Sequence, residues 1–472
     1  MRQKIGLILG PLAFATILMT PAPAGVPPLA WKTAAAGVLM AVWWITEAIP
    51  IPATALLPLA LFPALGVATI DRAAAPYANP IIFLFLGGFI LAIALENSGL
   101  HRRIAYRIMA VVGTRPRNLL FGFMLATALL SAAVSNTATV ALMLPMGLSV
   151  IALVNARTEG AESEGFATAL MLGLAYAATI GGLATLIGTP PNALLAGYLA
   201  ESHGLRIGFA QWMLLGVPLA AVALPVCWAI LLRLHRLPAG ALAGGAAALR
   251  DQIRSLGPIE RKERLAAAVT LFIALAWIFR PLLERRIPGL TDPGIAIAGA
   301  VLLFAIPVRW RRPEFVVRLG DLERVPWSVL LLFGGGLSLA SAVEASGLAL
   351  AIGRAVALLH GVPPWVAVVA VTTLVIFLTE MTSNTATAAA FLPIVGSAAA
   401  GIGTDPALLA VPTALAASCA FMLPVATPPN AIVYGSGRIS VVQMVRAGIW
   451  LNLALIALIT AATLLLARFV VE

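Results

Sequence analysis

The same short polar cluster occurs twice inside long apolar stretches of this sequence. Residues 135–139 and 383–387 both read Ser-Asn-Thr-Ala-Thr, and each copy is followed by a second shared cluster, Thr-Pro-Pro-Asn-Ala, at 189–193 and 427–431. Proline removes a backbone N–H, and Ser, Thr and Asn side chains compete for backbone hydrogen bonds, so each cluster is expected to interrupt a helix. Interrupted helices in matching pairs are typical of membrane transporters, which bind substrate near the bilayer midplane between internal repeats.

The composition supports a membrane protein and excludes several other classes. The chain has 472 residues, of which 61% are hydrophobic and only 10% are charged, whereas about a quarter of the residues in a soluble protein are charged. The net charge of +11 does not indicate nucleic-acid binding, because the basic residues lie in short gaps between apolar runs, where they set membrane orientation. The two cysteines and four histidines form no spaced cluster, so we expect neither a disulfide framework nor a metal enzyme.

Eleven apolar segments are long enough to cross a bilayer, which takes roughly 20 helical residues. Two further stretches, 118–155 and 365–400, each contain two half-length apolar arms with Ser-Asn-Thr near the middle. Each could be a pair of very short spans, but we favour re-entrant hairpins because neither tip carries a charge or a connecting loop. The first crossing also resembles a signal peptide, and we prefer a helix because the span count requires it. The predicted crossings are 5–20, 30–48, 50–68, 78–98, 165–200 (broken near 188–192), 211–232, 265–283, 292–308, 326–346, 406–437 (broken near 426–430) and 446–468.

The distribution of arginine and lysine predicts the orientation of these segments. With the N-terminus in the cytoplasm, the basic segments 102–117, 233–264 and 309–324 all fall on the cytoplasmic side, as the positive-inside rule requires. Only the connection 284–290, which carries two arginines, disagrees. The C-terminus then lies outside, and the two hairpins enter the membrane from opposite sides.

The matching clusters belong to a repeat that spans most of the chain. Glu96 and Glu344 are 344 − 96 = 248 positions apart, as are the two Ser-Asn-Thr motifs, and the Thr-Pro-Pro-Asn motifs are 427 − 189 = 238 positions apart. Apart from the first crossing, 5–20, each half contains five crossings and a hairpin, and an odd number of crossings inverts the second half relative to the first. The stretch 233–264 is rich in Ala, Gly and mixed charges, and we interpret it as the linker between the halves.

The interrupted helices offer ligands for both an anion and a cation. A half-helix that begins at a tip presents free N–H groups and the positive end of its dipole, which suits an anion. A half-helix that ends there presents free carbonyls, and Asn, Ser and Thr side chains add oxygens, which suit a hard cation such as sodium. No Lys, Arg or His lies between residues 118 and 155 or between 379 and 435. A bound cation would therefore have to balance the charge of an anion, which is a physical reason for co-transport.

Two of the polar features have alternative interpretations. Ser, Thr, Asn and Pro in membrane helices can simply pack and hydrogen-bond between helices, although two matched pairs in inverted repeats favour a binding site. Glu380 is the acidic residue next to an interruption, and Ala132 takes its place in the first repeat. It is a candidate proton carrier, because intramembrane carboxylates are functional by default, but we favour a structural role. If sodium couples transport, we expect Glu380→Gln to be tolerated.

The paired motifs resemble those of the divalent anion:sodium symporters (DASS), and the resemblance runs from residue 30 to residue 468. It implies an all-α polytopic membrane protein of about eleven transmembrane helices and two opposed re-entrant hairpins, arranged as inverted repeats in a homodimer. In this family a transport domain moves like an elevator against a scaffold. The scaffold would comprise residues 1–113 and 265–362, and the transport domain residues 114–264 and 363–472.

The resemblance also assigns residues to a binding site. It implies two sodium sites, the first formed by Ser131, Ser135, Asn136 and Gly188 and the second by Thr379, Ser383, Asn384 and Ala426. The substrate carboxylates would meet Asn136, Thr137, Asn384 and Thr385, with Thr189, Pro190, Thr427 and Pro428 close by.

The sequence thus predicts a secondary active transporter and not an enzyme, because no catalytic constellation is visible. We expect symport of a C4-dicarboxylate anion (succinate, malate or fumarate) with two or more Na⁺ ions, by a homodimer in the bilayer of the bacterial inner membrane. A sodium-independent dicarboxylate exchanger or a proton-coupled anion carrier is the alternative. Sulfate and tricarboxylates are less favoured substrates, because two intact Ser-Asn-Thr motifs resemble the carboxylate branch of the family. A channel is disfavoured, because helices broken between repeats suit alternating access better.

Overall fold

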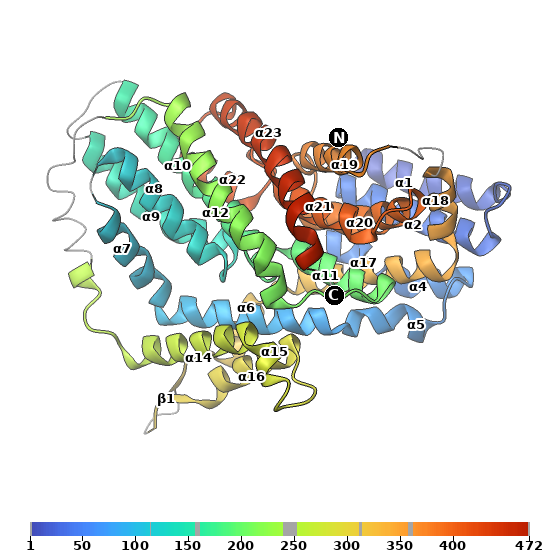
Figure 1. Ribbon diagram of the computed structural model, residues 1–472, viewed down its shortest axis with the longest axis horizontal. Helices are drawn as coiled ribbons and strands as arrows, with labels where there is room; N and C mark the ends of the chain where they lie inside the picture. The colour runs from blue at the N-terminus through green and yellow to red at the C-terminus, as the bar shows by residue number, and fades with distance from the viewer. Residues whose placement is uncertain are drawn as a thin grey trace.

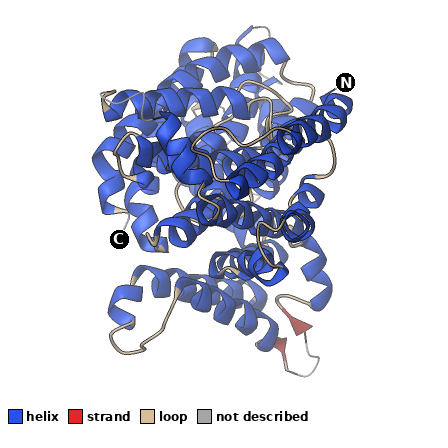
Figure 2. Ribbon diagram, turned by 90° about the vertical axis from the view of Figure 1, so that its right-hand side faces the viewer, coloured by secondary structure: helices blue, strands red, loops and turns tan. Residues whose placement is uncertain are grey.

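The protein is almost entirely helical wherever the structure is described (Figure 2). This computed structural model describes residues 2–113, 115–155, 161–238, 253–310, 314–356 and 362–470. Part of the linker predicted at 233–264 therefore lies outside the described residues. The all-α prediction is confirmed, with one small departure, an antiparallel pair of two short strands between two helices.

The first half of the chain contains the crossings and the hairpin predicted for it. Its elements are α1 (Arg2–Met19), α2 (Pro28–Thr46), α3 (Ile51–Thr54), α4 (Leu57–Leu65), α5 (Ile70–Ala74), η1 (Ala75–Ala78), α6 (Pro80–Ser98), α7 (Leu100–Val112), α8 (Pro116–Ser131), α9 (Asn136–Asn155), α10 (Ala161–Gly182), α11 (Pro190–His203) and α12 (Phe209–Leu234). Helices α8 and α9 are the arms of the first predicted hairpin.

The second half repeats the order of hairpin, broken crossing and last crossing, with a shorter helix before its break. Its elements are α14 (Arg261–Ile278), α15 (Arg280–Leu283), α16 (Asp292–Ala305), β1 (Pro307–Arg309), β2 (Glu314–Phe315), η2 (Leu319–Arg324), α17 (Trp327–Ala345), α18 (Leu348–Val356), α19 (Pro364–Thr379), α20 (Asn384–Gly401), α21 (Pro406–Ser418), α22 (Pro428–Gly435), α23 (Val441–Leu466) and η4 (Ala467–Phe469). Helices α19 and α20 are the arms of the second predicted hairpin.

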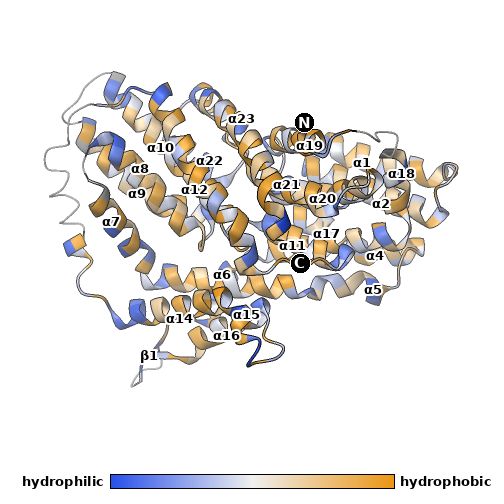
Figure 3. Cartoon of the chain, viewed as in Figure 1, coloured by the Kyte–Doolittle hydropathy of each residue, from blue (hydrophilic) through white to orange (hydrophobic). Residues whose placement is uncertain are grey.

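Seven of the described helices are long and apolar enough to cross a membrane by themselves. The shorter apolar helices include the hairpin arms α9 and α19 and the half-helix α21. Figure 3 shows hydrophobic residues along most of the helix lengths, with hydrophilic residues gathered near helix ends and connections. Helices of full-crossing length and shorter apolar helices are therefore both present, as predicted.

Both broken crossings open just before their proline pairs. The breaks occupy residues 183–189 and 419–427, slightly earlier than the positions 188–192 and 426–430 expected from the sequence. Proline is well tolerated in the first turn of a helix, where its missing N–H has no partner to lose. The proline pairs accordingly begin α11 and α22, and the unwound residues precede them.

The two halves of the chain pack into one another around α10. This helix is 94% buried along its apolar window, whereas α1 is only 11% buried. Helix α10 contacts the hairpin arms α8 and α9 of its own half, and also α22 of the second half. Helix α11 likewise contacts α20 and α21 of the second half. On the other side of the molecule, α14 and α16 pack along α6 (Figure 1). The interlocking brings both hairpin tips and both breaks to the centre.

Candidate substrate and cation site

The two hairpin tips are built in the same way. Helix α8 ends at Ser131 and α9 begins at Asn136; helix α19 ends at Thr379 and α20 begins at Asn384. The Ser131 hydroxyl donates to Asn136 Oδ1 at 2.5 Å, and the Thr379 hydroxyl donates to Asn384 Oδ1 at 2.8 Å. The last hydroxyl of each first arm therefore orients the asparagine that opens the second arm.

The two breaks are also closed by matching hydrogen bonds. Asn192 Nδ2 donates to carbonyls ten and seven positions earlier, at 3.2 and 2.9 Å. Asn430 Nδ2 does the same at 3.2 and 3.0 Å. Both asparagines are fully buried, so their amides fix the path of the unwound backbone. The four acceptors are the carbonyls of Gly182, Thr185, Ala420 and Leu423.

Each tip lies directly against the break of its own repeat. A Cβ added to Gly182 would come within 2.9 Å of Asn136 Oδ1 and 3.0 Å of the Gly188 carbonyl oxygen, so these three residues are in close contact. In the second repeat, Asn384 Nδ2 donates to the Ser418 carbonyl at 3.3 Å. Each tip asparagine thus lies against the end of the helix that leads into the break of its own repeat.

The residues at these junctions offer neutral oxygen ligands. Among the described residues, no group of three or more His, Cys, Asp or Glu side chains is placed to hold a metal ion. Backbone carbonyls, hydroxyls and amide oxygens suit a hard cation such as Na⁺ better than a transition metal. The two predicted sets are Ser131, Ser135, Asn136 and Gly188, and Thr379, Ser383, Asn384 and Ala426; Ser131 and Thr379 are fully buried, and the other six line the cavity described next.

One large cavity lies between the two tips and the two breaks. Its volume is about 1120 Å³. This cavity is lined by all the residues that the sequence predicts to bind the substrate, and these residues come from both repeats. They are Asn136, Thr137, Thr189, Pro190, Asn384, Thr385, Thr427 and Pro428.

Four helix N-termini meet at this cavity. Helices α9, α11, α20 and α22 begin at Asn136, Pro190, Asn384 and Pro428, and all four residues line the cavity wall. The first N–H groups of a helix have no intrahelical partner and carry the positive end of its dipole. These free N–H groups face the cavity, and neither hairpin carries a basic side chain of its own.

Two arginines that sequence reasoning missed lie at the rim of the cavity. Arg2 pairs with Glu47 at 2.9 Å, and Arg324 pairs with Glu96; all four side chains line the cavity. Arg2 also donates to the Met381 carbonyl near the second tip. Each arginine is far in sequence from the residues it contacts, so the sequence around it does not indicate these contacts. Because each arginine has its own carboxylate, the rim adds little net charge.

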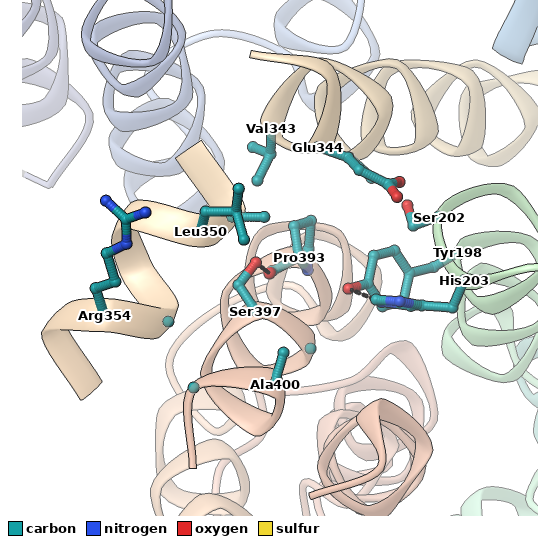
Figure 4. A pocket seen from close by; sticks show the side chains of 15 residues that line it. Tyr198, Ser202, His203, Val343, Glu344, Leu350, Arg354, Pro393, Ser397 and Ala400 are labelled. Carbon is teal, nitrogen blue, oxygen red and sulfur yellow. Dashed lines mark hydrogen bonds between the residues drawn. The ribbon is translucent and has the colours of Figure 1, made fainter. Parts of the chain in front are cut away.

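A second, smaller cavity of about 490 Å³ lies between α11, α17, α18 and α20 (Figure 4). Two pairs of its polar groups are engaged with each other: the Tyr198 hydroxyl contacts His203 Nε2 at 2.8 Å, and the Ser397 hydroxyl donates to the Pro393 carbonyl at 2.7 Å. It contains neither a hairpin tip nor a break. The large cavity is therefore the candidate site.

Comparisons with curated proteins identify relatives along almost the whole chain. The sodium-dependent dicarboxylate transporter SdcS of Staphylococcus saprophyticus is 45% identical over 468 residues, covering 97% of this chain and 90% of the relative. The protein of the same name from Staphylococcus aureus strain USA300 is 43% identical over 465 residues, covering 96% of this chain and 88% of the relative.

Solved structures with the same overall fold come from more distant transporters. The Alcanivorax borkumensis YdaH transporter aligns with a TM-score of 0.55 at 13% identity, covering 91% of this chain and 97% of that one. Neisseria gonorrhoeae MtrF, described in a study of antimetabolite efflux pumps, aligns with a TM-score of 0.57 at 11% identity, covering 97% and 94%. At such identities the likeness concerns the fold alone.

The family comparison covers the paired tips and breaks together. A family model described as the sodium:sulfate symporter transmembrane region matches residues 2–471, which include both Ser-Asn-Thr tips and both Thr-Pro-Pro-Asn breaks. The resemblance seen in the motifs is confirmed by this match and by the identity to the curated relatives. The chain belongs to the sodium:sulfate symporter family, that is, to the divalent anion:sodium symporters.

Proposed function

We propose that this protein is a secondary active transporter that moves a C4-dicarboxylate together with Na⁺. The SdcS relatives are named sodium-dependent dicarboxylate transporters and are 43–45% identical along most of the chain. The observation that carries the proposal is the convergence of four helix N-termini with two oxygen-lined junctions on one cavity. The N-termini attract the carboxylates, and Na⁺ at the junctions supplies the positive charge that the tips lack.

In this proposal the two tips take equivalent roles. Asn136, Thr137, Asn384 and Thr385 bind the substrate carboxylates, and the Thr-Pro pairs 189–190 and 427–428 form the adjacent wall. The cation sites lie behind them. Two observations support this arrangement: the tip asparagines line the cavity, and each is held by a buried hydroxyl of its own hairpin. Substrate and cation then share a ligand residue, which couples their binding.

The domain division and the membrane orientation belong to the same proposal. We assign residues 1–113 and 265–362 to a scaffold and residues 114–264 and 363–472 to an elevator-type transport domain, in a homodimer. The hairpins pack against α10, α21 and α22, and α6 packs against α14 and α16, which supports this grouping. With the N-terminus in the cytoplasm and the C-terminus outside, the two arginines that line the cavity lie on its cytoplasmic side.

The bacterial relatives and the apolar helices support a position of this multi-pass protein in the inner (cytoplasmic) membrane. Within that membrane, a sodium-independent exchanger or a proton-coupled carrier is the competing function. Sulfate is the competing substrate, because the family description names it. The competing functions differ from symport in the ion gradient that drives uptake, and the competing substrate differs in which unlabelled anion blocks it.

The test is uptake of radiolabelled succinate by the purified protein in liposomes, with and without an inward Na⁺ gradient. We expect uptake to require Na⁺ and to be blocked by unlabelled malate or fumarate but not by sulfate. Asn136→Ala and Asn384→Ala should each abolish uptake. Asn79→Ala, which removes a half-buried amide that caps the start of α6 and donates to Glu201 outside the cavity, is the matched control and should retain it. Uptake driven only by internal succinate would establish an exchanger, and normal uptake by both tip variants would refute the site.

A further inference from the structure

Helices end at the smaller cavity, whereas helices begin at the large one. The wall of the smaller cavity contains the last residue of α11, His203, the last residue of α20, Gly401, and the residue before the end of α17, Glu344. The last carbonyls of a helix have no intrahelical partner and carry the negative end of its dipole. The meeting of these three helix ends therefore favours a positively charged group in the cavity.

The side chains at these helix ends add hydrogen-bond acceptors. No ion pair of the described residues includes Glu344, although its carboxylate lines the cavity. Ser202 is only 8% exposed, and its hydroxyl faces the Glu344 carboxylate without forming a hydrogen bond of normal geometry (Figure 4). Because a buried polar group without a partner is costly, this pair of side chains is suited to a ligand that donates hydrogen bonds.

The rest of the wall is mostly apolar and continues to the outside of the molecule. Val343, Leu350 and Pro393 line the middle of the cavity (Figure 4). Leu350 is nevertheless 69% exposed, so the apolar wall reaches the surface along α18. Helix α17 is long and apolar enough to cross a membrane, and the ends of such helices lie near the lipid headgroups. The opening therefore suits a ligand that enters from the bilayer with an apolar portion against Leu350.

A basic side chain lies on the other side of this apolar wall. Arg354 projects from α18 at the edge of the cavity, and Leu350 lies between it and Glu344 (Figure 4). Arg354 is exposed, and no ion pair of the described residues includes it. An acidic and a basic side chain on either side of one cavity match a zwitterion, with its cation at Glu344 and its anion at Arg354.

We propose that the smaller cavity binds a phospholipid whose headgroup carries a primary ammonium, the chemistry of phosphatidylethanolamine. The ammonium donates to Glu344 beside Ser202, the phosphate pairs with Arg354, and the acyl chains leave along Leu350. A primary ammonium has three N–H donors, whereas the quaternary ammonium of phosphatidylcholine has none. The volume of about 490 Å³ lies within the range of small-molecule sites. The site is separate from the substrate cavity, so lipid binding can be tested without transport.

The test measures lipid binding as a rise in the thermal unfolding midpoint of the full-length protein, purified in detergent and freed of native lipid. Short-chain phosphatidylethanolamine is compared with its N-methylated forms up to phosphatidylcholine, all with the same acyl chains. We expect stabilisation to weaken as methyl groups replace the N–H donors. Glu344→Gln should raise the phosphatidylethanolamine concentration for half-maximal stabilisation about tenfold or more, the effect of one lost charge-assisted hydrogen bond. Glu284→Gln, which changes an exposed glutamate outside the cavity, is the matched control and should keep the wild-type lipid dependence.

Three outcomes would overturn this inference. Equal stabilisation by phosphatidylcholine would show that recognition does not need N–H donors. Wild-type lipid dependence in Glu344→Gln would show that the lipid binds elsewhere. Stabilisation by free phosphoethanolamine at the same concentrations as the lipid would show that the site takes a soluble zwitterion. None of these outcomes bears on Na⁺-dependent succinate uptake, which tests the proposed function separately.

Discussion

Gly188 provides the sharpest test of the first junction, because the structure leaves no room for a side chain there. A Cβ at this position would lie 2.5 Å from the Gly182 carbonyl oxygen and 2.9 Å from its Cα. Both atoms belong to the backbone at the end of α10, so neither can rotate away as a side chain would. Gly188→Ala must therefore displace the break from the tip at Asn136.

The size of the effect follows from the cost of overpacking. Inserting a methyl group into a filled site costs about 1–3 kcal/mol. If that strain falls on the Na⁺-bound geometry, the Na⁺ concentration for half-maximal uptake should rise between about fivefold and about 150-fold. Na⁺-dependent succinate uptake in liposomes measures this shift, and the unfolding midpoint without Na⁺ shows whether the fold is intact.

The second repeat supplies the matched control. Ala426 occupies the equivalent position, 188 + 238 = 426, and already carries a Cβ. Ala426→Gly should therefore change Na⁺ dependence only slightly. Wild-type Na⁺ dependence in Gly188→Ala, or an equal loss in Ala426→Gly, would refute the reasoning.

Two further predictions concern packing away from the site. A Cβ on Gly396 would lie 2.0 Å from the Tyr198 hydroxyl oxygen, so Gly396→Ala should lower the free energy of unfolding by about 1–3 kcal/mol. Adding Tyr198→Phe removes that hydroxyl and should restore part of the loss in denaturant-unfolding measurements. No recovery in the double variant would contradict this reasoning. Arg103 and Glu263 form an ion pair with Nε–Oε1 2.9 Å, and both are under a tenth exposed. Arg103→Ala leaves a buried carboxylate unpaired and should lower the free energy of unfolding by about 3–5 kcal/mol. The Na⁺ dependence of uptake should stay unchanged, and a shift in it would instead connect this ion pair to the site.

The centre of the fold could be predicted because its signals are local. Proline pairs and Ser-Asn-Thr clusters stand out inside apolar runs, and their repetition at fixed offsets identified both tips and both breaks. The exact limits of the breaks were harder to predict, because proline marks where the next half-helix begins and not where the preceding one ends. Residues 183–189 and 419–427 are unwound, and the amides of Asn192 and Asn430 hold their path.

The partners of charged residues were not predictable from the sequence. Arg2 and Arg324 pair with glutamates far along the chain, and nothing local to either arginine indicates this. Glu380 was recognised as unusual, and its bonds to the second break agree with the structural role that the sequence favoured; the tolerance of Glu380→Gln stays a prediction. Its main partners are backbone N–H groups. Because every residue except proline has one, the sequence could not indicate which of them Glu380 binds.

The amide closures by Asn192 and Asn430 also limit where the two halves can differ in length. Both amides reach back ten and seven positions, so an insertion or deletion inside either interval would separate donor from acceptor. The repeat offset nevertheless falls from 248 at the tips to 238 at the breaks, and the missing residues must lie between these two elements. Duplicated halves of such a protein can diverge in length only in that stretch and in their outer connections. An inserted peptide tag should accordingly be accepted between α20 and α21 and rejected between α21 and α22.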